Sequence, residues 1–112
     1  MHPPIPAETD TAISAWMRRH GWEVTTARLE TDPDGGFHVW QEKEPTGGRH
    51  HALWIADTMV RDLEPERLIE VLSREGVAEE IRISFKVRIE ERGAEYRVSI
   101  VPRKSGEFRR LE

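Results

Sequence analysis

The chain of 112 residues contains no cysteine. Disulfide bridges, thiolate metal sites and cysteine nucleophiles are therefore excluded. The sequence also lacks an apolar run long enough to cross a membrane. Its first residues, MHPPIPAETD, show neither the charged leader nor the apolar stretch of a signal peptide. We therefore expect a cytoplasmic protein.

Motifs of enzymes and metal sites are also missing. The five histidines show no HExxH-type spacing, and the neighbours His50 and His51 would point to opposite faces of a strand. No serine lies in a Gly-x-Ser-x-Gly elbow, and the glycine pairs precede no Gly-Lys-Ser/Thr phosphate loop. We predict no metal, no cofactor and no catalytic activity. The alternative of a small enzyme would need a deep pocket lined by His38 or His51 and a carboxylate.

Charge is abundant and unevenly distributed. Residues 81–112 hold nine Lys/Arg and five Asp/Glu, whereas residues 1–80 hold eight and sixteen. The chain is thus an acidic body with a basic C-terminal part. This polarity suits self-association as well as binding to an anionic partner.

The most regular pattern of the sequence runs from Glu80 to Arg103. Apolar residues occupy alternate positions from Ile81 to Ile89 and resume from Tyr96 to Ile100, which predicts two half-buried strands. We expect a β-hairpin with its turn at Arg92-Gly93, so that Ile89 faces Tyr96 and Arg88 faces Arg97.

The remaining elements complete an α+β domain. The sequence predicts a helix from about Thr9 to a glycine cap at Gly21, and a second helix from Pro65, with Glu64 as its N-cap, to Gly76. Between them it predicts strands at 22–29, with a bulge near Thr25-Thr26, at 37–42 and at 51–56. The expected fold is two-layer, α-βββ-α-ββ(-α), with one antiparallel five-stranded sheet and helices on one face. It forms a single domain over 1–112, with an extended segment at 1–8 and a basic tail or short helix at 104–112.

The predicted core joins the two helices to the hairpin. The helix residues are Ile13, Trp16, Met17, Leu68, Ile69 and Leu72. The facing row on the sheet is Ile83, Phe85, Val87, Val98 and Ile100.

The two middle strands are apolar on both faces, so the second sheet face needs a cover. We predict a homodimer interface there, formed by Trp40, Ala52, Trp54 and Ala56. A tryptophan at the sheet edge, or a helix and tail that wrap both faces, would explain the same pattern. The predicted function is a non-enzymatic, chaperone- or adaptor-like protein-binding module that acts as a homodimer and binds a partner polypeptide.

A row of basic residues suggests a second function. Its members are Arg82, Lys86, Arg88, Arg97 and Arg103. Basic residues beside aromatic ones on a sheet are typical of single-stranded RNA or DNA binding. A solvated strand face that resists aggregation would show the same row.

The predicted order of elements, over residues 9–112, resembles the fold of the class I type III secretion chaperones and the related YbjN-type proteins. The resemblance rests on element order and on no sequence motif. It implies a small, cofactor-free and usually dimeric protein that binds a partner polypeptide.

Overall fold

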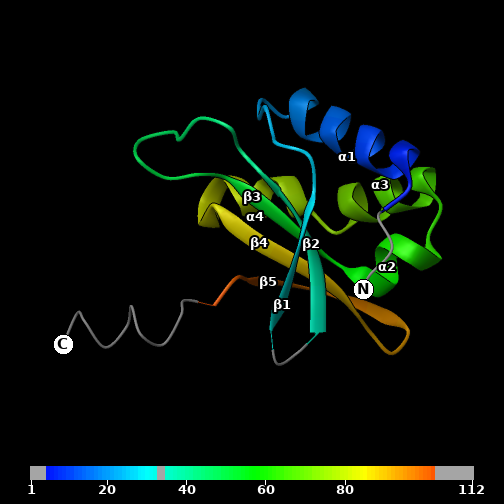
Figure 1. Ribbon diagram of the computed structural model, residues 1–112. Coiled ribbons are helices and arrows are strands. Elements are labelled where there is room, and N and C mark those ends of the chain that lie inside the picture. Colours follow the sequence, from blue (N-terminus) through cyan, green and yellow to red (C-terminus); the bar gives the residue numbers. More distant parts are fainter. Residues whose placement is uncertain (1–4, 33–34, 103–112) are drawn as a thin grey trace.

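The computed structural model describes residues 5–32 and 35–102, which form helices and strands (Figure 1). The helices are α1 (Ala7–Arg19), α2 (Asp57–Asp62), α3 (Pro65–Arg74) and α4 (Val77–Ser84). The strands are β1 (Arg28–Asp32), β2 (Gly35–Gln41), β3 (Ala52–Ala56), β4 (Lys86–Arg92) and β5 (Glu95–Ile100). The fold is α+β, as predicted. Arg103 and the predicted tail at 104–112 lie outside the described residues, as do residues 1–4 of the predicted N-terminal segment.

The five strands form one mixed sheet in the order β1-β2-β3-β4-β5. Neighbouring strands are antiparallel except β3 and β4, which are parallel. The prediction of a purely antiparallel sheet is therefore wrong. A parallel pair needs a crossover, and the segment with α2, α3 and α4 supplies it.

Helix α4 replaces the first half of the predicted C-terminal hairpin. Its buried residues Val77, Ala78 and Ile81 follow helical spacing, and Glu79 and Glu80 lie in its first turn, where acidic residues stabilise a helix. On a helix Ile83 lies nearly opposite Ile81, and it is 76% exposed. The prediction that residues 81–85 form a strand is wrong. Ile81 belongs to a buried helical face with Val77 and Ala78, so the apolar alternation at 81, 83 and 85 does not reflect a strand.

The observed hairpin has a shifted register. Arg92 pairs with Glu95, which leaves Gly93 and Ala94 in the turn instead of Arg92 and Gly93. Ile89 consequently pairs with Val98, and Arg88 with Ser99. The predicted opposition of two arginines does not occur, because Arg97 pairs with Glu90.

The predicted bulge in the first extended segment is confirmed. Val24 bridges Glu42, whereas Arg28 pairs with Val39. From Val24 to Arg28 the chain advances four residues, while the partner segment advances three, from Glu42 to Val39. The first segment therefore holds one extra residue, which is a bulge. The regular strand β1 begins only after it, later than predicted.

Two glycines set the directions of the helices. Gly21 follows α1 at φ 97°, while the N–H of Trp22 binds the carbonyl of Met17, which is a Schellman cap. Gly76, at φ 69°, separates α3 from α4. Both positions favour glycine because other residues rarely adopt positive φ.

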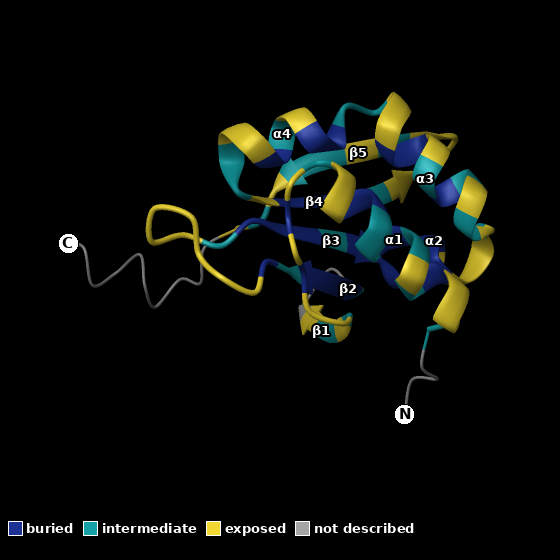
Figure 2. Cartoon of the chain, turned by 90° about the horizontal axis from the view of Figure 1, so that it is seen from above, coloured by how far each residue is buried: buried dark blue, intermediate teal, exposed yellow. Residues whose placement is uncertain are grey.

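The core lies between the sheet and the helices (Figures 1 and 2). Trp40 on β2 is fully buried and donates its Nε1–H to Asp10 Oδ1 on α1 at 2.7 Å. From the predicted row Val87 is buried and Val98 partly buried, but Ile83 and Ile100 are exposed. The predicted helix residues all belong to the core or pack against it. In the described part of the chain, no helix has both the length and the apolar character needed to cross a membrane.

Candidate functional site

The structure separates the two tryptophans of the predicted interface. Trp40 pairs with Leu53, and Trp54 pairs with Val39. Since directly opposite residues share a face, Trp40 and Trp54 point to opposite faces of the sheet. Trp40 is fully buried beneath α1 and is not part of an open face.

The face that carries Trp54 is largely covered. Ala52 and Val39 are fully buried, and Ala56 is 8% exposed. The centroids of the Trp54 and Phe37 rings lie 6.1 Å apart, and the Arg88 guanidinium lies 5.0 Å from the Phe37 centroid. Trp54 itself is half-buried, so this face offers little free apolar surface.

The predicted basic row is divided. Lys86, Arg88 and Arg97 share one face of the sheet, since Arg88 pairs with Trp54 and Arg97 pairs with Glu90, two residues after Arg88. Arg82 instead lies on α4 and pairs with Glu79. Arg88 is buried, and Lys86 is exposed at the start of β4. Arg103 lies outside the described residues.

Strand β5 is an edge of the sheet (Figure 2). Its residues are half-buried or exposed, and Ile100 is 61% exposed. Its sequence, EYRVSI, contains neither proline nor lysine, the residues that commonly block strand pairing at an edge.

The hydrogen-bond pattern gives the direction of each backbone group of β5. Val101 donates its N–H to Lys86 at 3.0 Å. Bonded and non-bonded pairs alternate along an antiparallel ladder, so Arg97 and Ser99 also bond toward β4. The N–H and C=O groups of Tyr96, Val98 and Ile100 therefore point away from β4, toward the side of β5 on which no other strand of residues 5–32 and 35–102 lies.

A second feature, which we call the stacked cluster, consists of Trp16, His20, Trp22, His51 and Phe85. His51 lies between Trp22, at a centroid distance of 5.1 Å, and Phe85, at 4.5 Å. His20 contacts both tryptophans, at 4.7 and 6.1 Å. The cluster therefore joins α1, the start of β3 and the junction between α4 and β4.

Arginines lie over aromatic rings of the stacked cluster. The guanidinium of Arg49 lies 4.2 Å from the Phe85 centroid, and that of Arg82 lies 5.4 Å from Trp22. Arg82 also donates to His20 Nδ1 at 3.2 Å. Burial lowers the pKa of His20, and the nearby Arg82 and Arg19 lower the pKa further.

The imidazole of His51 is oriented by Glu42. Oε1 of Glu42 accepts bonds from Nδ1 and the backbone N–H of His51, at 2.9 and 3.1 Å. Thr46 donates to Oε2 at 3.0 Å. Burial alone would raise the pKa of the Glu42 carboxyl, but these bonds hold the pKa below its usual range.

Another buried carboxylate binds His38. Asp57 Oδ1 lies 2.7 Å from His38 Nε2, and Arg61 donates to Oδ2. Burial opposes ionisation, but the bonds from His38 and Arg61 outweigh it and lower the pKa of Asp57. This group ties the start of α2 to β2.

Among residues 5–32 and 35–102, no group of three or more His, Asp or Glu side chains is arranged so that it could hold a metal ion. Sequence reasoning did not single out Glu42, Arg49 or the stacking of Phe85. Their partners are far away in sequence, so no local spacing signals them.

The structure defines the protein as an α+β domain with a mixed five-stranded sheet. No known family, curated protein or solved structure matches the chain.

Proposed function

We propose that the protein is a non-enzymatic, protein-binding module whose edge strand β5 pairs with β5 of a second copy. The observation that carries the proposal is the open edge with outward-pointing backbone groups at Tyr96, Val98 and Ile100. Unpaired strand edges are templates for pairing with another chain.

The sequence of β5 complements itself in one antiparallel register. With the two-fold axis at Val98, each Val98 lies opposite its copy and Tyr96 lies opposite Ile100 of the partner. Tyr96, Val98 and Ile100 point their backbone groups away from β4. The Val98–Val98 pair and both Tyr96–Ile100 pairs would therefore be hydrogen-bonded. Apolar side chains then meet apolar ones on the side facing the core.

Charge favours the same register. An axis at Arg97 would oppose two arginines, which is unfavourable. The axis at Val98 instead places Arg97 opposite Ser99 of the partner. It also covers Ile100, which is 61% exposed in one copy.

The other edge is less suited to pairing. On β1, Arg28 and Glu30 bind each other at 2.9 Å, and both side chains are at least two-fifths exposed. Charged side chains on an edge discourage pairing, and β1 (RLETD) carries three of them in five residues, whereas β5 (EYRVSI) carries two in six. The proposal therefore assigns dimerisation to β5.

The test is the solution mass of the wild type and two variants by light scattering on a size-exclusion column. Val98→Pro removes an outward N–H without removing a bond to β4, and Ile100→Lys places a charge at the edge. Both variants should have the mass of a monomer where the wild type has that of a dimer. Thr11→Lys, which adds the same charge on an exposed position of α1, should remain dimeric.

Circular dichroism of each variant shows whether it folds. A monomeric wild type at all concentrations would reject the proposal. A folded Ile100→Lys variant that remains a dimer would reject β5 as its interface. Trp54→Asp then tests the covered face of the sheet, and loss of the dimer in that variant would restore the Trp54 interface predicted from the sequence.

A further inference from the structure

We propose that the β5 dimer holds a phosphate dianion on its two-fold axis, bound by Arg97 of both copies. The inference rests on the dimerisation proposed above, because one copy alone supplies only half of the site. It follows from the register of the β5 pair, from two side chains that find no polar partner in the described part of one copy, and from the charge of the surrounding face.

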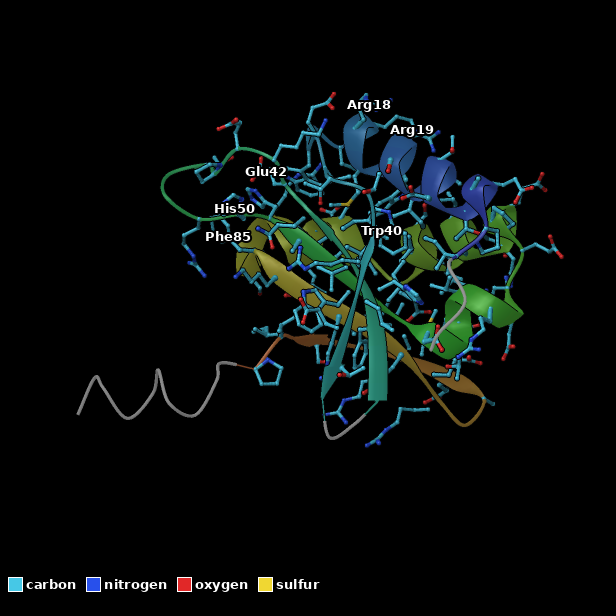
Figure 3. All side chains as sticks on the ribbon, viewed as in Figure 1. Arg18, Arg19, Trp40, Glu42, His50 and Phe85 are labelled. Atoms are coloured by element: carbon cyan, nitrogen blue, oxygen red, sulfur yellow. The ribbon has the colours of Figure 1, made fainter. Side chains whose placement is uncertain are left out.

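Arg97 and Ser99 lie on the sheet face away from the helices. Ser99 pairs with Arg88, and Arg88 pairs with Trp54. Directly paired residues share a face, and so does Arg97, two positions before Ser99. Trp40 lies between the sheet and α1, on the opposite face (Figure 3). Arg97 is exposed, so a ligand can reach it from the side without helices.

The proposed axis at Val98 brings the two Arg97 side chains together. Val98 faces its own copy, so Arg97 lies opposite Ser99 of the second copy, in a pair without backbone hydrogen bonds. The two Arg97 residues are then diagonal neighbours across the new strand pair, about 7–8 Å apart. Long side chains span this distance, so both guanidinium groups can contact one ion on the axis.

The described residues of one copy leave the polar groups of Arg97 and Ser99 without partners. The guanidinium of Arg97 forms no ion pair with a described residue, although Glu90 is paired with it on β4. Ser99 Oγ is buried and has no hydrogen-bond partner among these residues, which costs stability. In the dimer, Arg97 can donate one N–H to Ser99 of the second copy and keep the others of its five for a ligand.

The face of the hairpin around the axis is positively charged. The alternate positions of β4 and β5 on this face carry four cations and two carboxylates in each copy: Lys86, Arg88, Arg92 and Arg97 against Glu90 and Glu95. Without an anion, the two Arg97 charges of the dimer repel each other. An ion between them removes this repulsion, so ion binding and dimer formation should favour each other.

A phosphate dianion matches the site better than a carboxylate does. The planar guanidinium donates two parallel N–H groups to two oxygens of either anion. A carboxylate has two oxygens and a single charge, which one guanidinium satisfies. A phosphate monoester has a charge of about −1.5 to −2 at neutral pH and further oxygens, so it can bind both guanidinium groups at once.

Sedimentation equilibrium of the wild type, with and without inorganic phosphate, tests the site. Sodium chloride at the same ionic strength is the control, since salt also screens the repulsion between arginines. One ion per dimer should lower the dimer dissociation constant about tenfold when phosphate is present at about ten times its own dissociation constant. Isothermal titration calorimetry should find one phosphate for each pair of chains.

Variants separate the ion from the strand pairing. Arg97→Gln should remain a dimer through the backbone bonds of β5 but lose the response to phosphate. Arg97→Lys keeps the charge without the planar fork and should bind phosphate more weakly. Arg74→Gln, which removes the same charge from an exposed position of α3, is the matched control and should respond like the wild type.

Methyl phosphate, a small monoester, identifies the source of the ligand. A response equal to that of inorganic phosphate would assign a phosphorylated group to the site. A weaker response would assign the free ion.

The outcomes distinguish the ion site from the dimer. A wild type that forms the dimer but responds equally to phosphate and chloride would overturn the ion site and leave the β5 dimer standing. Full phosphate response in Arg97→Gln would overturn it as well. A wild type that stays monomeric in both salts would reject the dimer and the site together. The wild-type titrations decide the question even if a variant does not fold.

Discussion

At the scale of single residues, two buried carboxylates connect distant parts of the chain. Glu42 holds both ends of the loop between β2 and β3 through Thr46 and His51. Asp57 connects α2 to His38 on β2. A buried carboxylate is stable only when hydrogen bonds offset its loss of solvation, and each of these has at least two donors.

The bonds to Glu42 should make the stability of the protein depend on acidity. The pKa of Glu42 in the folded chain lies below the ordinary value of 4.5. The unfolded chain therefore binds more protons in this range, and the free energy of unfolding falls as the pH drops from about 4.5 through the folded pKa. The stabilisation is fully present above this range.

Glu42→Gln should reduce this acid dependence and destabilise the protein at pH 7 by about 1–3 kcal/mol, because charged hydrogen bonds are lost. Urea denaturation at pH 7 and below pH 4.5 measures both effects. Glu91→Gln, at an exposed position of β4, is the control. Equal pH dependence in wild type and Glu42→Gln would contradict the assigned role.

At the scale of elements, α4 shows how one pattern fits two structures. The residues Ile81, Ile83 and Phe85 alternate like a strand, but Val77, Ala78 and Ile81 also share one helical face. Gly76 starts α4 directly after α3, and α4 packs against both α3 and β4. Tertiary packing thus selects the helix.

Substitutions in α4 distinguish the two structures. Ile81 is fully buried, so Ile81→Ala should destabilise the protein by about 2–5 kcal/mol. Ile83 is 76% exposed, so Ile83→Ala should change the free energy of unfolding by less than about 0.5 kcal/mol. A strand would bury both side chains. Similar losses in the two variants, measured by chemical denaturation, would therefore argue against α4.

At the scale of the whole molecule, the pairing of β4 with β3 places β5 at the edge of the described sheet. The crossover through three helices brings β4 beside β3, and the hairpin then adds β5 outside it. Both the β5 edge and the stacked cluster depend on this topology. Phe85 reaches His51 because Ala52 and Lys86 are paired residues.

Dimerisation through β5 should make thermal stability depend on protein concentration. Association favours the folded chain by mass action, so the Tm of the wild type should rise with concentration. The Tm of Ile100→Lys should not change with concentration, because this variant is expected to be a monomer whose unfolding is not coupled to dissociation. Calorimetry over a wide concentration range tests this, and a wild-type Tm that is independent of concentration would contradict the dimer.

Local patterns in the sequence predicted much of the fold correctly. The glycine stop at Gly21, the Glu64-Pro65 helix start and the bulge before β1 are all confirmed. Each of these features is set by the backbone geometry of a few neighbouring residues, so a local sequence pattern predicts it. The prediction of a dimer, by contrast, remains a prediction, with its proposed interface moved from Trp40 and Trp54 to β5.

The sequence by itself determined the class of the fold, the middle strands and most of the helix core, because hydrophobic spacing and turn residues act over a few positions. The tertiary structure decided the helical state of α4, the parallel pair, the burial of Trp40 and the stacking of His51 on Phe85. These features depend on which distant segments compete for the same buried surface. No spacing within one segment contains that information.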